Sequence, residues 1–275
     1  MGSIDRYTKR CIKAILSLKD DAIFWPRKQE KQLIKSRIKK NFHFSGCIRY
    51  IIDGTLIPLF NKPVNHGSDY YSHKGSYGIT APVVCDDMKR IRHALIGYPG
   101  GAHDHRILYE TSLCDRPGRY FKGSEYLLGD FEFTADPILM SSFKGNNGKG
   151  RNEDEAMFHI RVKKARFAIE NYFAALKGRF QSLRDMRKII RNEKDAKGFD
   201  EWFRCCCILH NLLIADVDDW VEEELGKENS EAELREALFN STPEDPQDKQ
   251  TRELAGKQKR IRLMNIVNRL PLPEK

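Results

Sequence analysis

Three acidic residues stand inside segments that are otherwise apolar, and these residues are the best suited to chemistry. Asp53 lies in YIIDGTLI, Asp130 in YLLGDFEF and Glu170 in RFAIENYF. A buried carboxylate is costly unless a cation or a metal ion accompanies it. An arginine partner or a turn would explain any one of them alone, whereas three acids in matching surroundings favour a shared metal site.

Such a site predicts the cleavage of phosphodiester bonds. That reaction needs an activated water or hydroxyl group and neutralised charge on the leaving oxygen, and two divalent ions roughly 3.5–4 Å apart supply both. Magnesium prefers hard oxygen ligands and keeps several waters, so a few carboxylates suffice to hold it. We therefore expect a divalent metal cation, Mg²⁺ or Mn²⁺, as the cofactor.

Strands are expected to position two of the acids. The segment CIRYIIDGTLIPLF begins at Cys47, is rich in β-branched and aromatic residues, and predicts a strand that contains Asp53. YGITAPVVCDD and RIRHALIGYPG predict two more strands joined by a turn at 86–89, so that the three form an antiparallel meander. SEYLLGDFEF predicts a fourth, short strand that ends at Gly129-Asp130.

Helical periodicity covers most of the remaining apolar positions, and the third acid falls in a long amphipathic helix. Residues 4–42 predict two short helices, interrupted at Trp25-Pro26. Further helices are expected from His103 or Asp104, around 137–142, over 158–183 with Glu170, over 196–214, and over 257–270 as a basic closing helix.

This order of strands and helices is typical of an α/β fold, an RNase H-like mixed sheet flanked by helices. In that fold the acids come from the first strand, the end of the fourth strand and a late helix. We expect a shortened N-terminal helical segment at 1–44, the catalytic domain at 45–214, and a C-terminal helical and acidic extension at 215–275.

The charge distribution favours a polyanionic partner. The net charge is +9, yet residues 216–248 hold 13 acidic and 2 basic residues, a balance of −11 that leaves +20 for the rest. A body that basic suits nucleic acid, although a merely solvated basic surface is the simpler alternative. The sequence contains no apolar run of about 18 residues, so it predicts no membrane span. The odd number of cysteines, 7, favours free thiols in a reducing compartment.

Several motifs in order resemble one known family, the PIF/Harbinger transposases and the nucleases derived from them. The motifs run from about Trp25 to Leu213, and they are IIDGTLIPL, YYSHKGSYGITAPVVCD, GYPGGAHDHRIL, LLGDFEF, RVKKARFAIENYFAALKGRF and CCCILHNLL. The resemblance implies that Asp53, Asp130 and Glu170 form the DDE catalytic triad of the family. Two motifs depart from the family pattern, at Ser72-His73-Lys74-Gly75 and at Phe131-Glu132.

The resemblance also implies function. It implies a metal-dependent DNA endonuclease of the DDE transposase type, with strand transfer as a further step. The alternative is a domesticated, catalytically inactive DNA-binding or scaffold protein, and the sequence leaves both open. Nuclear localisation with a cytoplasmic pool, a homo-oligomer and a Myb-like DNA-binding partner protein are further expectations, the last because the segment ahead of the catalytic domain is short.

Other candidate residues have weaker signals. His103 and Asp104 are expected to support the metal ligands from behind or to cap a helix. Asp86 is expected to make a turn, and Cys205 to Cys207 with His210 to pack in the core rather than to bind zinc. Contacts with nucleic acid are expected from Tyr70, Tyr71, Lys74, Arg106, Arg166, Lys177 and Arg179.

Overall fold

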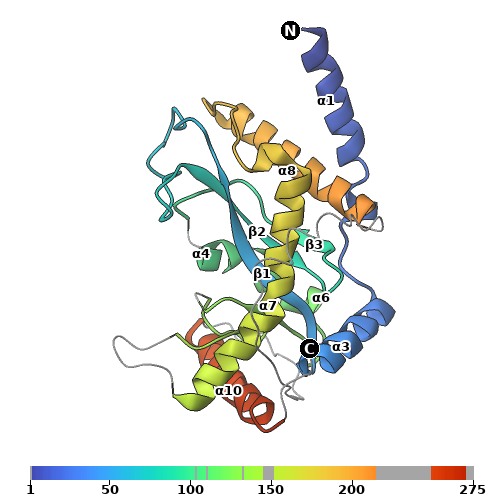
Figure 1. The fold of residues 1–275 in the computed structure, drawn as a ribbon, viewed down its shortest axis with the longest axis vertical. Coiled ribbons are helices and arrows are strands. Elements are labelled where there is room, and N and C mark those ends of the chain that lie inside the picture. The colour runs from blue at the N-terminus through green and yellow to red at the C-terminus, as the bar shows by residue number, and fades with distance from the viewer. Residues whose placement is uncertain are drawn as a thin grey trace.

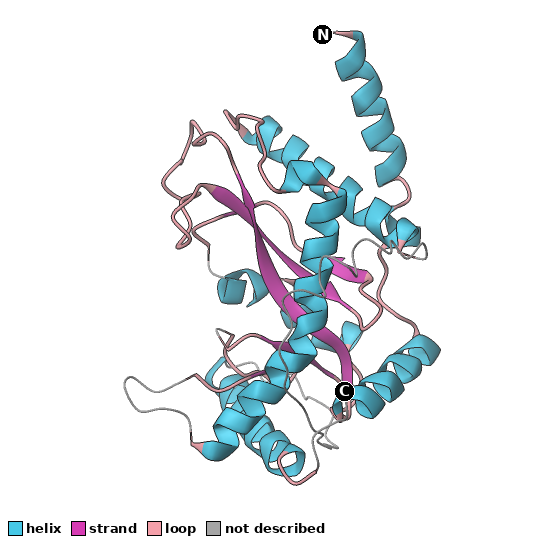
Figure 2. Cartoon of the chain, in the orientation of Figure 1, coloured by secondary structure: helices cyan, strands magenta, loops and turns pink. Residues whose placement is uncertain are grey.

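The protein folds as a mixed sheet between two layers of helices (Figure 2). The structure, a computed structural model, describes residues 2–102, 104–109, 111–131, 133–144, 152–214 and 249–270, with the backbone alone at 49–53, 104, 105 and 167–170. The acidic stretch and most of the polar loop before the long helix lie outside the described residues. In the described part, no helix is long and apolar enough to span a membrane.

The first three strands form the predicted antiparallel meander. β1 (Cys47–Pro58) pairs with β2 (Gly78–Cys85), which pairs with β3 (Ile91–Ala94) and with the short β4 (Tyr98–Pro99). β2 is buried along its whole length, as its apolar run predicts.

The other half of the sheet is parallel to β1. β5 (Tyr126–Gly129) pairs with β1, and β6 (Leu139–Ser141) pairs with β5, which gives the order β3-β2-β1-β5-β6. The helix predicted around 137–142 was therefore wrong. Its apolar core has only three residues, too few for periodicity to distinguish a helix from a strand, and pairing with β5 decides the outcome.

Each face of the sheet is covered by its own apolar cluster. One face carries Ala81, Val83 and Leu128, which pack with Tyr172 and Leu176 of the long helix α7 (Glu153–Arg179). This face also supports α8 (Glu193–Leu213). Figure 1 shows α7 crossing in front of β1. The opposite face carries Val84 and Leu127, which pack against the short helices α4 (Asp104–Tyr109), α5 (Ser112–Asp115) and α6 (Pro117–Tyr120). The RNase H-like architecture expected from the element order is confirmed.

Helix α7 begins where its sequence can satisfy the free amides of its first turn. The Asn152 side chain accepts from the Glu155 amide at 2.8 Å, and the Glu155 carboxylate reaches back to the Asn152 amide at 3.4 Å. This reciprocal cap starts the helix at Glu153, five residues before the predicted start at Phe158. A 3₁₀ turn, η1 (Gln181–Leu183), follows its end.

Three N-terminal helices precede the sheet, where two were predicted. α1 (Ser3–Leu16) extends away from the body (Figure 1), and α2 (Lys19–Ala22) is one short turn. α3 (Lys28–Phe42) buries Ile34 and Ile38 against the core. The last described helix, α10 (Lys249–Val267), lies at the bottom of Figure 1 and contacts β6.

Helix α10 covers the edge of the sheet. Arg252 pairs with the buried Asp136 at 3.1 Å, and Lys259 donates to the carbonyls of Ser124 and Pro137. At Gly256 an added Cβ would lie 2.4 Å from the Ala135 carbonyl oxygen, so only glycine permits this approach.

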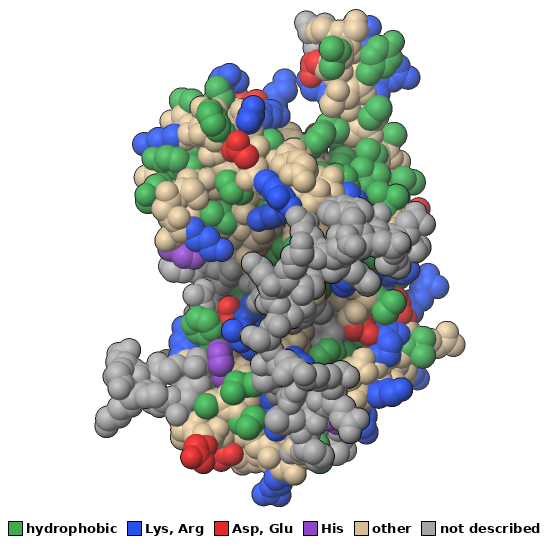
Figure 3. Space-filling view, in the orientation of Figure 1, with side chains coloured by type: hydrophobic (Ala, Val, Ile, Leu, Met, Phe, Trp, Pro, Cys, Tyr) green, Lys and Arg blue, Asp and Glu red, His purple; other side chains and the backbone are tan. Residues whose placement is uncertain are grey.

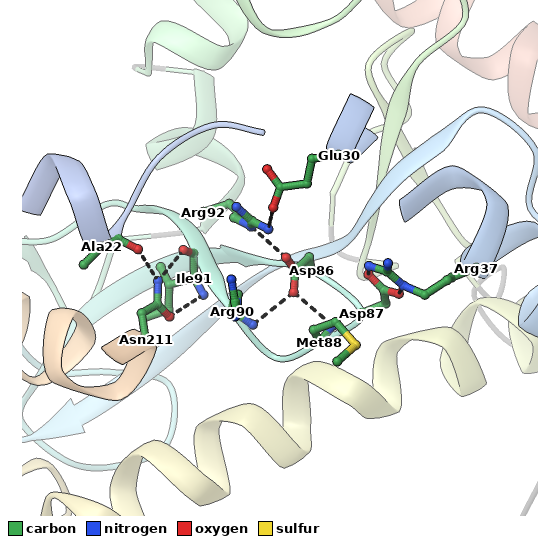
Figure 4. Close-up of polar contacts among 10 residues, drawn as sticks. All are labelled: Ala22, Glu30, Arg37, Asp86, Asp87, Met88, Arg90, Ile91, Arg92 and Asn211. Carbon is green, nitrogen blue, oxygen red and sulfur yellow. Dashed lines mark hydrogen bonds and ion pairs between the residues drawn. The ribbon is translucent and has the colours of Figure 1, made fainter. Parts of the chain in front are cut away.

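A polar network ties the β2–β3 turn to the helices around it (Figure 4). Asp86 accepts from the amides of Met88 and Arg90 and pairs with Arg92 at 2.6 Å, and Arg92 also binds Glu30 of α3. The prediction that Asp86 makes a turn is confirmed.

One side chain of this network links three elements. Asn211 of α8 accepts from the Ile91 amide at 2.9 Å and donates to the carbonyls of Ile91 and Ala22 at 2.7 and 2.8 Å. Because a single side chain makes all three bonds, its removal takes a hydrogen-bond partner from backbone groups of both β3 and α2.

Asn211→Ala is therefore expected to lower the free energy of unfolding by about 1–3 kcal/mol, since unpaired buried backbone groups carry a desolvation cost. Denaturant unfolding measures the change. Leu212→Ala, which truncates the next residue where the side chain is 49% exposed, is the matched control. Equal losses in the two variants would contradict the linking role.

Candidate active site

The register of β1 brings two of the predicted acids together. Ile52 pairs with Gly129 in the parallel ladder, so Asp53 and Asp130 are the next residues on neighbouring strands. Asp53 itself pairs with Val83, and cross-strand partners share one face of the sheet. Val83 packs in the cluster that contains α7. Position 53 therefore lies on the face that α7 covers, beside the end of β5.

Asp130 makes an ion pair with α7. Its Oδ1 atom lies 2.7 Å from Nη1 of Arg166, and it also accepts from the Phe131 amide at 2.6 Å. Arg166 is only 8% exposed, whereas the Asp130 side chain is 23% exposed. The carboxylate thus keeps contact with solvent on one side and holds a buried guanidinium on the other.

Two contacts fix how α7 crosses the sheet. Arg166 meets Asp130 at the end of β5, and Nζ of Lys177 donates to the Leu56 carbonyl of β1 at 2.8 Å. Glu170 follows Arg166 by one helical turn, on the neighbouring surface of the helix. The helix turn that carries position 170 therefore crosses between these two contacts, over the stretch of β1 that contains position 53.

The backbone thus brings the three predicted triad positions to one region. The side chains of Asp53 and Glu170 lie outside the described residues, so the side-chain geometry of the triad is described for Asp130 alone. Among the described side chains, no group of three or more His, Cys, Asp or Glu residues is placed to hold a metal ion.

The donor set nevertheless fits a divalent cation. Carboxylate oxygens are the ligands that Mg²⁺ and Mn²⁺ prefer. The one described carboxylate of the site already accepts a cation, the Arg166 guanidinium, at 2.7 Å. Asp130, with the residues at positions 53 and 170, would hold the metal ion on the α7 face of the sheet.

Of the two supporting residues predicted upstream, the structure describes only the backbone of Asp104. His103 is outside the described residues, and the backbone of Asp104 begins α4. α4 packs through Leu108 on the sheet face opposite α7. Arg106 is exposed and lines a cavity with Tyr71.

The remaining predicted contacts gather near the far end of β1. Tyr71 and Lys74 are exposed, and Lys177 is half-buried. Arg179 instead faces inward and contacts Nδ1 of His210 at 3.2 Å. His210 is buried against the Tyr172 ring and lies on α8 with the buried Cys205 to Cys207, in agreement with the predicted core packing.

Sequence reasoning missed two features of this region. Arg166 was expected to contact nucleic acid, and the structure sets it against Asp130, nearly buried. Its spacing of one helical turn from Glu170 was the available signal. Arg184 was not singled out, although its Nε donates to the Lys177 carbonyl at 3.3 Å.

Comparison with known proteins identifies the family. The chain belongs to the DDE superfamily endonucleases, whose family model matches residues 52–211 and so includes all three acids. The family resemblance expected from the motifs is confirmed.

Two curated relatives are similar over part of their length. The chain is 23% identical over 233 residues to "Protein ALP1-like" of Arabidopsis thaliana, which covers 79% of this chain and 54% of that protein. It is 22% identical over 152 residues to "Putative nuclease HARBI1" of Homo sapiens, which covers 55% of this chain and 42% of that protein. The chain thus spans about half the length of these relatives or less. No solved structure matches it.

Removal of the Arg166 charge is expected to change how the site responds to metal. Arg166→Gln leaves Asp130 beside other acidic positions without its counter-charge, which should lower metal-free stability by about 1–3 kcal/mol. Magnesium should then raise the melting temperature more than in the wild type, because the cation no longer competes with arginine. Thermal unfolding with EDTA and with Mg²⁺ measures both effects. The exposed Lys163→Gln on the same helix is the control, and an unchanged magnesium shift in Arg166→Gln would count against the competition.

Lys177 is expected to make stability depend on pH. Burial, with smaller contributions from Lys74 and Arg184, lowers its pKa from 10.5 to about 8. Between these pH values the unfolded chain binds a proton on Lys177 that the folded chain does not. The free energy of unfolding therefore rises with pH through this window.

Lys177→Met should therefore flatten the rise in melting temperature above pH 8. Some rise should remain, because burial also lowers the pKa of Lys259 to about 8. Melting curves across the alkaline range test this, with the exposed Lys194→Met as control. A slope identical to that of the wild type would refute the assignment.

Proposed function

We propose that this chain is a divalent-metal-dependent DNA endonuclease of the DDE transposase type, with Asp53, Asp130 and Glu170 as its catalytic and metal-binding acids. The observation that carries the proposal is the β1–β5 register, which makes Asp53 and Asp130 neighbours. The Arg166–Asp130 pair supports it, because it brings the α7 turn with Glu170 to the same place.

The residues of the chain have distinct roles in this proposal. A bound Mg²⁺ or Mn²⁺ supplies an activated water and neutralises charge on the leaving oxygen. Asp130 and the acids at positions 53 and 170 hold the cation. Arg166 neutralises Asp130 before the metal arrives and becomes available to a substrate phosphate when the carboxylate exchanges partners.

DNA is the substrate that the charge pattern favours. Outside residues 216–248 the chain carries +20, and neutralisation of phosphates by such a surface makes binding steeply salt-dependent. Attack of a released 3′-hydroxyl on a second DNA, as in strand transfer, would use the same acids.

Location and partners extend the proposal. A nuclear location follows from DNA as substrate, and a Myb-like DNA-binding partner would supply target selection. A homo-oligomer would bring two sites to one DNA. Size-exclusion chromatography with DNA and cross-linking to a co-expressed partner would test these assemblies directly.

A plasmid-nicking assay tests the activity. Wild-type protein should nick supercoiled DNA in Mg²⁺ or Mn²⁺ and not in EDTA. Asp53→Asn, Asp130→Asn and Glu170→Gln should each reduce the rate by at least about a hundredfold, and their effects should not add because the three act as one unit. Asp20→Asn, at a carboxylate that is 95% exposed on α2, is the matched control.

Binding separates the proposed nuclease from its alternative. All three variants should retain DNA binding, because cations outside the triad would supply the phosphate contacts. Wild-type protein that binds DNA but never nicks it in either metal would identify a domesticated DNA-binding protein. An Asp53→Asn protein that nicks DNA at the wild-type rate would contradict the triad assignment.

A further inference from the structure

A second charged surface lies near the far end of β1, beyond the acids. Figure 3 shows Lys and Arg side chains among hydrophobic ones over the upper left of the molecule, where Figure 1 places the loop between β1 and β2. We call the following residues the basic–aromatic surface: Lys62, Tyr71, Lys74, Tyr77, Lys177 and Arg184.

Three cations of this surface crowd one another. Lys177 is held by the Leu56 carbonyl at 2.8 Å, Arg184 by the Lys177 carbonyl at 3.3 Å, and Lys74 and Arg184 both repel the Lys177 charge. Across the described residues, none of the three forms an ion pair with a carboxylate. Mutual repulsion among cations that have no counter-charge among the described side chains favours an anion from outside, and a phosphate group would relieve it.

Two tyrosine rings flank the turn that carries Lys74, and they are held in a fixed position. The rings of Tyr71 and Tyr77 contact edge to face with centroids 5.2 Å apart, and Tyr71 is 52% exposed. Ser72 closes the turn between them, because its amide and its hydroxyl both donate to the Ser76 carbonyl at 2.9 Å. Lys62 lies 5.8 Å from the Tyr77 ring. The exposed ring is therefore a pre-positioned stacking surface.

Tyr71 also borders a cavity large enough for a nucleobase. The cavity has a volume of ≈ 580 Å³ and is lined by Asp69, Tyr98 and Arg106, among others. Aromatic rings bind a base by its face, a carboxylate accepts from its exocyclic amines, and arginine binds phosphate.

We propose that the basic–aromatic surface binds an unpaired segment of a DNA strand, with phosphates on Lys74, Lys177 and Arg184 and a base stacked on Tyr71. Duplex DNA hides its base faces and would need only the cations. Exposed rings interleaved with cations are the arrangement that binds single strands. This inference rests on the proposed function for the choice of DNA as the polyanion.

The surface has a defined place relative to the acids. Leu56, which holds Lys177, follows Asp53 by three residues on β1, about 10 Å along the strand. The unpaired segment would therefore lie close to the bond that the acids cut.

Binding of labelled DNA in EDTA tests the inference without any cleavage. Fluorescence anisotropy compares a blunt duplex with the same duplex carrying a single-stranded extension. Wild-type protein should prefer the extended duplex. Tyr71→Ala should weaken binding of that DNA about tenfold and leave the blunt duplex unchanged, while Tyr71→Phe should keep the preference because it keeps the ring.

Charge variants and controls complete the experiment. Lys74→Gln should weaken binding of the extended duplex and lower the salt slope by about one. Tyr7→Ala and Lys28→Gln, at exposed positions on α1 and α3, should change neither DNA. Melting temperatures verify that each variant is folded.

The two proposals fail separately. Equal affinity for the two DNAs, or a Tyr71→Ala variant that binds the extended duplex like the wild type, would overturn the unpaired-strand surface even if the protein nicks plasmid. Absence of nicking with a retained preference would remove the nuclease and leave the surface standing.

Discussion

The parallel pairing of β1 with β5 is the constraint on which the candidate site depends. Asp53 and Asp130 come from distant parts of the chain, and only the match of Ile52 with Gly129 makes them neighbours. A slip of one residue would turn a whole strand over and send its acid to the opposite face. The buried core on both faces prevents that slip, because every apolar side chain of the strand would also change sides. The register that packs the sheet therefore also places the acids.

Much of this arrangement could be predicted, and the exceptions have physical causes. The meander and the long helix follow from periodicity over many residues, and the acids stand out because their neighbours are apolar. β6 was predicted as a helix because Leu139–Ser141 is too short to show a period, and its conformation comes from pairing with β5. The role of Arg166 depends on the angle at which α7 crosses the sheet. That angle results from packing between segments far apart in sequence, which no local pattern contains.

Positive charge is handled in two different ways on one molecule. Arg166 is compensated by Asp130 in a partly dry setting, where each group stabilises the charge of the other. Lys74, Lys177 and Arg184 are compensated by nothing among the described side chains, and the repulsion is partly avoided because Lys177 gives up its proton more easily. The first arrangement responds to competition between cations. The second responds to anions and to ionic strength. The Arg166–Asp130 pair and the basic–aromatic surface are therefore sensitive to different solution conditions.

The position of α10 has a consequence for biosynthesis. This helix is the last described element of the chain, yet it covers the β5–β6 edge through Arg252 and a glycine contact at Gly256. During translation the sheet must therefore emerge and pair while this edge is still bare, and bare edges invite pairing with other chains. Nascent chains are consequently most prone to such pairing until α10 has emerged from the ribosome. A premature stop codon after α8 would leave every predicted catalytic residue in place and still yield a polypeptide that depends on chaperones.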